Sequence, residues 1–234
     1  MEHAEFLNTP HQNNNILSIV SWNINGARTK LEQNNVYIFL SNFDIISINE
    51  VKSSLNVSIP GYVPFKSKNV LGNASLRGGT VVMIRNYLAN QVFNVDNSML
   101  DQVWLQLKCF PSLMFAFCYI PPTDSSYFSH NLFSNIQEKM SDFKSYKNVC
   151  IIGDLNARFG NSVRSIISRS TNINIQSCSY PNIPDDIASP NDSAYILSSI
   201  CVDNDLIVLN NVKTPISHSQ VKKLLSVGIN GFQK

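Results

Sequence analysis

The sequence predicts an α/β domain made of short apolar strands with a few amphipathic helices between them. The first observation is length, because 234 residues fit one sizeable α/β or β-sandwich domain and, less easily, two small ones. The second is composition, because 44% hydrophobic residues are enough to build a core. The third is pattern, since β-branched runs bounded by Gly, Pro, Asn or Asp recur along the chain, with segments of helical periodicity between them.

The first part of the chain predicts two strands and a helix after a polar lead-in. Residues 1–15 are Asn-rich and are expected to be disordered. Residues 16–25 (ILSIVSWNIN) alternate and are rich in β-branched residues, which predicts a strand that ends at Gly26. Residues 29–40 place apolar side chains at roughly helical spacing, and residues 44–50 (DIISINE) predict a second strand that ends in a carboxylate.

The middle of the chain predicts further strands. Residues 61–68 and 78–86 (GGTVVMIRN) are separated by a loop rich in Asn, Gly and Ser. Residues 102–108 alternate between apolar and polar, the pattern of a sheet with one solvated face. Residues 113–120 are almost wholly apolar and are stopped by two prolines, which predicts a buried strand.

Next come a predicted helix, a buried strand and a long irregular stretch. The side-chain oxygens of residues 123–125 predict the start of a helix that runs to about Tyr146. Residues 149–152 (VCII) have the pattern of a buried strand. Residues 157–192 are rich in Ser, Asn and Pro without periodicity, which is more typical of a functional or flexible loop than of regular structure.

The last part of the chain predicts a helix from Asn191 or Asp192 through Ile200, and then a strand at residues 206–212. Residues 221–227 predict a short helix. No internal repeat or clean linker divides the chain.

Charge, cysteines and hydropathy restrict the class of protein. The net charge of +2 is too small to indicate a nucleic-acid partner by itself. The five cysteines show no C-x-x-C spacing and three lie in apolar runs, which indicates core residues in a reducing compartment. No apolar signal segment begins the chain, and its longest apolar run is too short to cross a bilayer, so an intracellular protein without membrane association is expected.

Several predicted strands end in a polar side chain of a type used in catalysis: Asn23, Glu50, Tyr119, and Asp154 with Asn156. Each has an ordinary explanation, because Asn beside Gly is commonly a turn residue and a Glu after a strand is commonly solvated. Brought to one edge of a sheet, however, they would suit phosphodiester hydrolysis. That reaction needs a carboxylate to hold a divalent cation, an acid or base to orient water, and neutral donors for the phosphate oxygens.

Five segments occur in the order and spacing of the endonuclease/exonuclease/phosphatase superfamily: SWNINGAR (21–28), INE (48–50), GGTVVMIR (78–85), CYIPP (118–122) and IGDLNARFG (152–160). From about Ile16 to Val212 the chain resembles in particular the apurinic-like endonuclease domain of non-LTR retrotransposons. The resemblance implies a four-layer α/β sandwich of two packed mixed sheets flanked by helices. It also implies a DNA-nicking endonuclease that needs Mg²⁺ or Mn²⁺, takes DNA as substrate and works in the nucleus.

The resemblance also implies a role for each polar strand end. Glu50 resembles the principal metal ligand, and Asp154 the carboxylate that positions or deprotonates the attacking water. Asn156 resembles the amide that contacts the scissile phosphate, and Tyr119 the phenol that donates to it. Asn23 resembles the residue that helps to hold the catalytic carboxylates in place.

Two further residues have weaker counterparts in the family. Asn25 stands where some relatives carry an Asp near the metal, and a neutral amide would weaken a second metal contact. Arg158 could face the DNA backbone, although an exposed Arg is more often simply solvated.

The end of the chain departs from the family pattern. The family continues with two strands that carry an Asp and then a closing Ser-Asp-His. Here residues 213–234 contain His218 between two serines, and no Asp or Glu follows Asp205. We therefore expect residues 16–212 to form an incomplete domain that lacks the last strands, followed by a divergent tail at 213–234, with little or no hydrolysis.

Other functions stay open at this stage. Within the superfamily the chain could be an abasic-site repair nuclease or a phosphatase. From a different class, it could be a non-catalytic nucleic-acid-binding remnant, an idea motivated by the arginines between Arg158 and Arg169. The product could also have no selected role.

Overall fold

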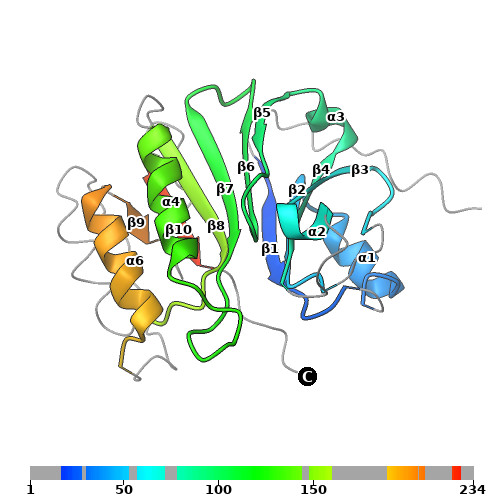
Figure 1. Ribbon diagram of the computed structural model, residues 1–234. Helices are drawn as coiled ribbons and strands as arrows, with labels where there is room; N and C mark the ends of the chain where they lie inside the picture. Colours follow the sequence, from blue (N-terminus) through cyan, green and yellow to red (C-terminus); the bar gives the residue numbers. More distant parts are fainter. Residues whose placement is uncertain are drawn as a thin grey trace, which may run out of the picture.

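Two β-sheets pack face to face, and helices cover both outer faces (Figure 1). The computed structural model describes residues 17–27, 30–52, 57–71, 78–143, 148–159, 189–204, 206–208 and 223–227. The layers run from α1 through the two sheets to α4 and α6. The predicted four-layer α/β sandwich is therefore confirmed.

The N-terminal sheet has four strands in the order β1-β2-β4-β3, of which β1 and β2 are parallel and the others pair antiparallel. Its elements are β1 (Ile19–Asn23), β2 (Ile45–Asn49), β3 (Tyr62–Lys66) and β4 (Thr80–Arg85), with α1 (Asn34–Leu40), α2 (Lys68–Leu71) and α3 (Asn86–Ala89). Helix α1 connects β1 to β2, as a parallel pair requires.

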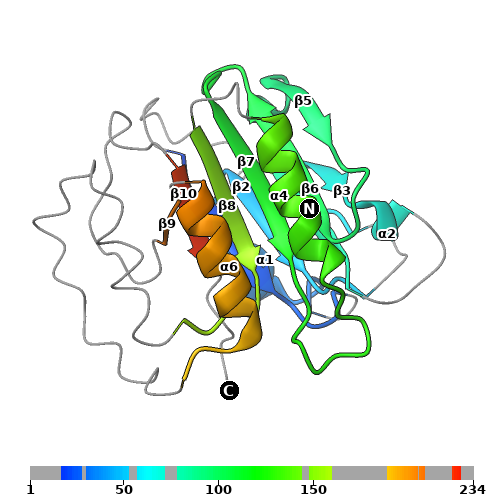
Figure 2. The same cartoon turned by 60° about the vertical axis from the view of Figure 1, so that its left-hand side comes forward.

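The C-terminal sheet has six strands in the order β5-β6-β7-β8-β10-β9. Its elements are β5 (Val92–Asp96), β6 (Gln102–Leu107), β7 (Leu113–Tyr119), β8 (Asn148–Asp154), β9 (Ile207–Val208) and β10 (Lys223–Val227), with α4 (Asn131–Asp142) and α6 (Asp192–Asp203). Strand β7 is parallel to β8, and β8 is parallel to β10. Figure 2 shows α4 and α6 over the outer face of this sheet.

The alternation of side chains along the strands builds three apolar layers. In β2, Ile45 packs between the sheets, whereas Ile46 and Ile48 pack on the side of α1. In β7, Phe115 and Phe117 face the other sheet, and alternate residues of the strand pack toward α4 and α6. Because both faces of these strands are covered, their sequences are apolar at nearly every position.

The structure corrects the prediction for residues 221–227. A short helix was expected there, but Lys223–Val227 forms strand β10, which lies between β8 and β9 and pairs parallel with both. The prediction was wrong because periodicity cannot separate a short apolar helix from a strand. The hydrogen-bonding edge of β8, supplied by a distant part of the sequence, decided the outcome.

The other predicted elements are confirmed with shifted ends, but the solvated face expected for residues 102–108 was wrong, because every residue of β6 is buried. Helix α4 begins at Asn131 rather than near Thr123, because residues 123–130 form turns in which Ser125 N donates to the Pro122 carbonyl (2.9 Å). Helix α6 has the predicted N-cap, since the Asn191 side chain accepts from the Ala194 amide. Of the predicted strand at 206–212, residues 207–208 form β9; residues 1–15 and most of 157–192 lie outside the described residues.

Two expectations about composition can be compared with the structure. The four cysteines in the described part of the chain are free thiols, and two of them, Cys118 and Cys201, are buried in the core. In the same part of the chain, no helix combines the length and the apolar character that a membrane span requires.

Gly153 permits the close approach of β7 and β8. Its φ is +152°, and a Cβ placed on it would lie 1.8 Å from the Cys118 carbonyl oxygen. Only glycine fits there, because the obstacle is backbone of the neighbouring strand and cannot rotate away. The contact comes one residue before Asp154, so it also sets where the end of β8 lies.

We predict that Gly153→Ala lowers the free energy of unfolding by more than about 4 kcal/mol, because the methyl group forces the two strands apart. Gly61→Ala is the matched control. Its φ is +85° and a Cβ there would meet nothing within 4 Å. It should cost only the backbone strain of about 1–2 kcal/mol. Urea unfolding followed by circular dichroism measures the free energy of unfolding of both variants. Equal losses of stability in the two variants would contradict the prediction.

Candidate active site

The carboxyl ends of four strands meet at one edge of the sandwich. Asn23 ends β1 and pairs with Asn49 of β2, which Glu50 follows directly. In the other sheet Tyr119 ends β7 and pairs with Asp154, the last residue of β8. Parallel pairing places the ends of neighbouring strands side by side, and the packing of the sheets brings the two pairs together.

The amide of Asn23 joins the two sheets at this edge. Its Nδ2 donates to Glu50 Oε1 (2.9 Å) and to Asp154 Oδ2 (2.8 Å). Its Oδ1 accepts from the backbone amide of Asn25 (3.0 Å), which fixes the orientation of the side chain. Two carboxylates from different sheets are therefore held by one neutral donor group.

Glu50 accepts further hydrogen bonds and an ion pair. The Tyr119 hydroxyl donates to Oε1 (2.6 Å), and the Lys52 ammonium lies 2.6 Å from Oε2. Burial by itself would raise the pKa of the Glu50 carboxyl, but Lys52, Tyr119 and Asn23 outweigh it and hold the pKa below 4.5. Burial and the hydrogen bond to Glu50 raise the pKa of the Tyr119 phenol, which stays a donor.

Asp154 is in a different electrostatic environment. It is buried, and burial together with the nearby charge of Glu50 raises the pKa of its carboxyl above 3.8, against hydrogen bonds from Asn23 and from the Asn156 amide. Two carboxyl groups with oppositely shifted pKa values are thus linked through one amide. Such a pair suits two different roles in acid–base chemistry.

Asn156 lies beside this network on the loop after β8. Its Nδ2 donates to the Ile120 carbonyl (2.8 Å), which uses one of the two N–H donors of the amide. Asn191, the N-cap of α6, donates to the Asn156 carbonyl (2.8 Å) and accepts from the Arg158 amide (3.0 Å). The Arg158 side chain is exposed.

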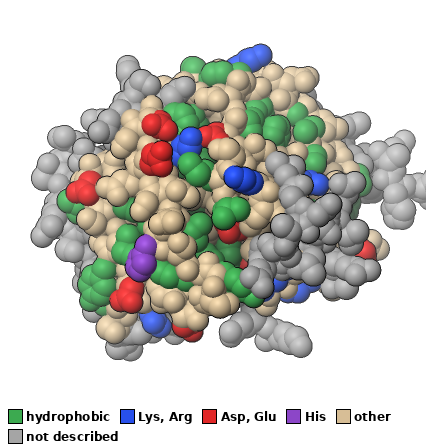
Figure 3. All heavy atoms as spheres, in the orientation of Figure 1, with side chains coloured by type: hydrophobic (Ala, Val, Ile, Leu, Met, Phe, Trp, Pro, Cys, Tyr) green, Lys and Arg blue, Asp and Glu red, His purple; other side chains and the backbone are tan. Residues whose placement is uncertain are grey.

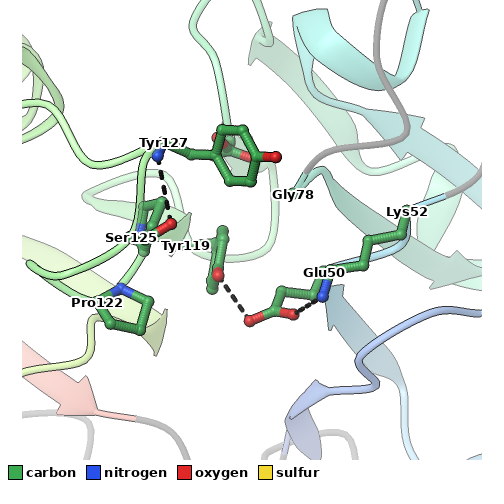
Figure 4. A pocket seen from close by; sticks show the side chains of 9 residues that line it. Glu50, Lys52, Gly78, Tyr119, Pro122, Ser125 and Tyr127 are labelled. Atoms are coloured by element: carbon green, nitrogen blue, oxygen red, sulfur yellow. Dashed lines mark hydrogen bonds and ion pairs between the residues drawn. The ribbon is translucent and has the colours of Figure 1, made fainter.

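A pocket of about 440 Å³ opens beside Glu50 and Tyr119. In Figure 4 these two side chains point toward one another, with Lys52 on one side and Pro122, Ser125 and Tyr127 across the pocket. On the face drawn in Figure 3, the described Lys and Arg side chains lie among acidic and apolar ones. The described surface on that face therefore has no broad basic patch.

The structure brings five predicted site residues together and leaves the Arg158 side chain exposed beside them; their chemical roles stay predictions. Asn23, Glu50, Tyr119 and Asp154 form one hydrogen-bonded network, and Asn156 joins it through Asp154 Oδ1 (3.1 Å).

Sequence reasoning missed Asp101, which lines the pocket. Its Oδ1 accepts from the Gly79 amide (2.5 Å) and from Asn69 Nδ2 (2.7 Å). Its carbonyl accepts from the Tyr119 amide (2.9 Å) and from the Thr80 hydroxyl (3.0 Å). Asp101 thus ties β4 to β7 across the sheets. The available signal was a carboxylate directly before the alternating strand at residues 102–108.

Lys52 was also missed, although it follows Glu50 by two residues. Its ammonium lies 2.6 Å from Glu50 Oε2 and donates to Asn25 Oδ1 (2.7 Å). A cation therefore already lies between two oxygen atoms at the edge of the pocket.

The oxygen atoms at this position fit a hard divalent cation. Within the described ranges no three His, Cys, Asp or Glu side chains are grouped closely enough to hold a metal ion. Mg²⁺, however, is commonly bound by one or two carboxylates, with water and substrate phosphate as the other ligands. The Glu50 carboxylate and the Asn25 amide oxygen are donors of that kind.

No protein-family model and no curated protein matches this chain. Among solved structures it is similar to an AP endonuclease from Archaeoglobus fulgidus, with a TM-score of 0.40 and 16% identity over 62% of this chain and 59% of that one. It is also similar to the AP endonuclease LMAP from Leishmania major, with a TM-score of 0.49 and 13% identity over 62% and 56%.

A third similar structure is the 3′ phosphatase NExo from Neisseria bound to product DNA hairpin, with a TM-score of 0.47 and 16% identity over 63% of this chain and 60% of that one. This chain therefore spans less than two thirds of each solved protein.

We predict that Asp101→Asn stabilises the protein at neutral pH. Burial raises the pKa of the Asp101 carboxyl above 3.8, so its charge opposes folding above the folded-state pKa. Asn keeps the acceptor oxygen and tolerates the φ of +56°. We expect the Tm to rise by a few degrees at pH 7. In a domain of this size, 1 kcal/mol of stability corresponds to about 2–4 °C in Tm.

This gain should shrink as the pH falls through the folded-state pKa toward 3.8, and it should vanish only below 3.8, where Asp101 is protonated in both the folded and the unfolded state. Thermal unfolding between pH 7 and pH 4 measures it. Asp124→Asn is the control, because Asp124 is exposed. A gain that is independent of pH would contradict the prediction.

Proposed function

We propose that this chain hydrolyses phosphodiester bonds in DNA with a divalent cation, as an endonuclease of the non-LTR retrotransposon type. The observation that supports the proposal is the Asn23 amide, which holds Glu50 and Asp154 together at the end of two sheets. The Tyr119 phenol and a pocket of about 440 Å³ complete the arrangement. Fixed carboxylates with neutral donors beside a pocket are what attack on a phosphate by water requires.

The opposite pKa shifts suggest a role for each carboxylate. Glu50, with a lowered pKa, would hold Mg²⁺ or Mn²⁺ as an anion. When bound, the cation offsets phosphate charge and polarises the phosphorus–oxygen bonds. Asp154, with a raised pKa, would orient a water molecule and take its proton while the water oxygen bonds to phosphorus and the bond to the leaving sugar oxygen breaks.

The neutral donors would contact the phosphate. The Tyr119 hydroxyl stays protonated, and Asn156 keeps one N–H that is not used on the Ile120 carbonyl. Both would donate to phosphate oxygens as negative charge develops there. Arg158, exposed four residues after Asp154, would face the DNA backbone.

We further propose that turnover is slow. The leaving sugar oxygen needs a proton, and the family supplies an acid–base His at the end of the domain. In the part of the chain that the structure describes, the single His is His130, which packs on Phe128 with ring centroids 5.0 Å apart. A positioned acid–base group typically contributes about 10²–10⁴-fold to the rate.

We predict that the purified chain nicks supercoiled plasmid slowly in Mg²⁺ or Mn²⁺ and that chelation of the metal stops it. Glu50→Gln should lower the rate at least about 10²-fold, because the amide removes the charge that holds the cation. Glu138→Gln, an exposed change on α4, is the matched control and should keep the rate. Gel analysis of nicked plasmid measures the nicking rate of the wild type and of the two variants.

Two outcomes would contradict the proposal. Nicking that Glu50→Gln leaves unchanged would remove Glu50 from the reaction. A wild-type chain that nicks nothing in either metal would mean that the site is not catalytic. The second outcome would favour a non-catalytic DNA-binding remnant, the rival that the exposed Arg158 beside the site supports.

Substrate choice separates the remaining candidates. We predict cleavage of plain duplex DNA, with no preference for an abasic duplex and no release of phosphate from inositol phosphates. Preference for the abasic duplex would indicate a repair nuclease, and phosphate release a phosphatase. A binding remnant would retain DNA in a salt-sensitive manner, with a salt dependence that Glu50→Gln does not alter.

A further inference from the structure

Lys52 lies on a backbone segment that is held on both sides. On one side Val51 N donates to the Gly79 carbonyl (3.2 Å), and Lys52 N donates to the Gly78 carbonyl (3.0 Å). On the other side Gly26 N donates to the Glu50 carbonyl (2.8 Å). The start of the Lys52 side chain is therefore fixed relative to Glu50.

This segment has an unusual backbone conformation. Glu50 and Lys52 have φ of +53° and +46°, in the left-handed region of backbone conformation. Residues other than Gly, Asn and Asp seldom adopt it. Strain of this kind persists only where the surrounding structure enforces it, and it gathers at functional sites. The fold thus fixes the direction in which the Lys52 side chain leaves the backbone, beside Glu50.

The Lys52 ammonium lies where a cation would bind Glu50. It is 2.6 Å from Glu50 Oε2 and 2.7 Å from Asn25 Oδ1. Glu50 Oε1 already accepts hydrogen bonds from Tyr119 and Asn23, so a divalent cation would bind Glu50 through Oε2. The Lys52 side chain is 40% exposed, whereas that of Glu50 is 13% exposed. The ammonium is therefore open to displacement toward solvent, while the carboxylate is held by Tyr119 and Asn23.

We propose that Lys52 is a built-in counter-cation that competes with the divalent cation for Glu50 Oε2 and Asn25 Oδ1. The proposal rests on the proposed function, because it takes Glu50 as the metal ligand. In the metal-free protein the ammonium neutralises the partly buried carboxylate, whose charge would otherwise lack a partner at Oε2. Binding of the metal displaces the ammonium, so Lys52 sets the metal concentration at which the site fills.

Mn²⁺ binding at neutral pH, measured by electron paramagnetic resonance of free Mn²⁺, tests this without any activity assay. Lys52→Met should bind Mn²⁺ about tenfold more tightly than the wild type, since it removes a charge-assisted contact at the carboxylate. Lys52→Arg keeps the charge and should not gain affinity. Lys108→Met removes an exposed charge elsewhere and is the matched control.

A second measurement uses the wild type and does not depend on the folding of a variant. Mg²⁺ should raise the rate at which a reagent acetylates Lys52 severalfold, because the displaced ammonium leaves its ion pair. Acetylation of Lys108 in the same sample should not change. Mass spectrometry of the peptides gives both rates.

The outcomes separate this inference from the proposed function. Equal Mn²⁺ affinity in the wild type and Lys52→Met, lost in Glu50→Gln, overturns the role of Lys52 and leaves Glu50 as the metal ligand. The absence of Mn²⁺ binding in every variant overturns both proposals. Tighter binding by Lys52→Met together with Mg²⁺-dependent acetylation of Lys52 supports the inference.

Discussion

The hydrogen bonds from the Asn23 amide to Glu50 and Asp154 are the contacts on which the arrangement of the site depends. The hydrogen bond from Tyr119 to Glu50 and the contacts of Asp101 also join the sheets at this edge, whereas the apolar packing between the sheets is strong but has no preferred direction. Packing alone would allow the strand ends to slide. A planar amide with two N–H donors fixes both carboxylates at once, and the other oxygen of each contacts Lys52 or the Asn156 amide. The position of the site therefore follows from directional hydrogen bonds between two sheets whose apolar packing has no preferred direction.

Backbone strain gathers around these contacts. In the described ranges, every residue other than Gly with positive φ lies at or beside the site: Asn25, Glu50, Lys52, Asp101 and Asn156. Asn and Asp tolerate this conformation, but Glu and Lys seldom adopt it. Each of these residues is held by backbone or side-chain hydrogen bonds from neighbouring strands or loops. Strain of about 1–3 kcal/mol per residue persists only where such neighbours enforce it.

Most of the fold could be predicted from the chain because periodicity and turn residues are local signals. The strands at Ile45–Asn49, Thr80–Arg85 and Leu113–Tyr119 are recognisable from their apolar runs, since both of their faces are buried. Strand β10 was missed for the opposite reason: five residues carry too little pattern, and the free edge of β8 decided their conformation. Helix α4 was predicted too long, because cap residues at 123–125 form turns instead.

The sequence by itself determined which polar side chains stand at the strand ends: Asn23, Glu50, Tyr119 and Asp154. It could do so because the end of a strand is marked by neighbouring residues. Only the tertiary structure decided that Asn23 bridges the two carboxylates and that Asp101 and Lys52 lie at the same pocket. These contacts join segments far apart in the chain or depend on left-handed backbone at Glu50 and Lys52, and neither leaves a periodic pattern. Their physical cause is the packing of one sheet on the other.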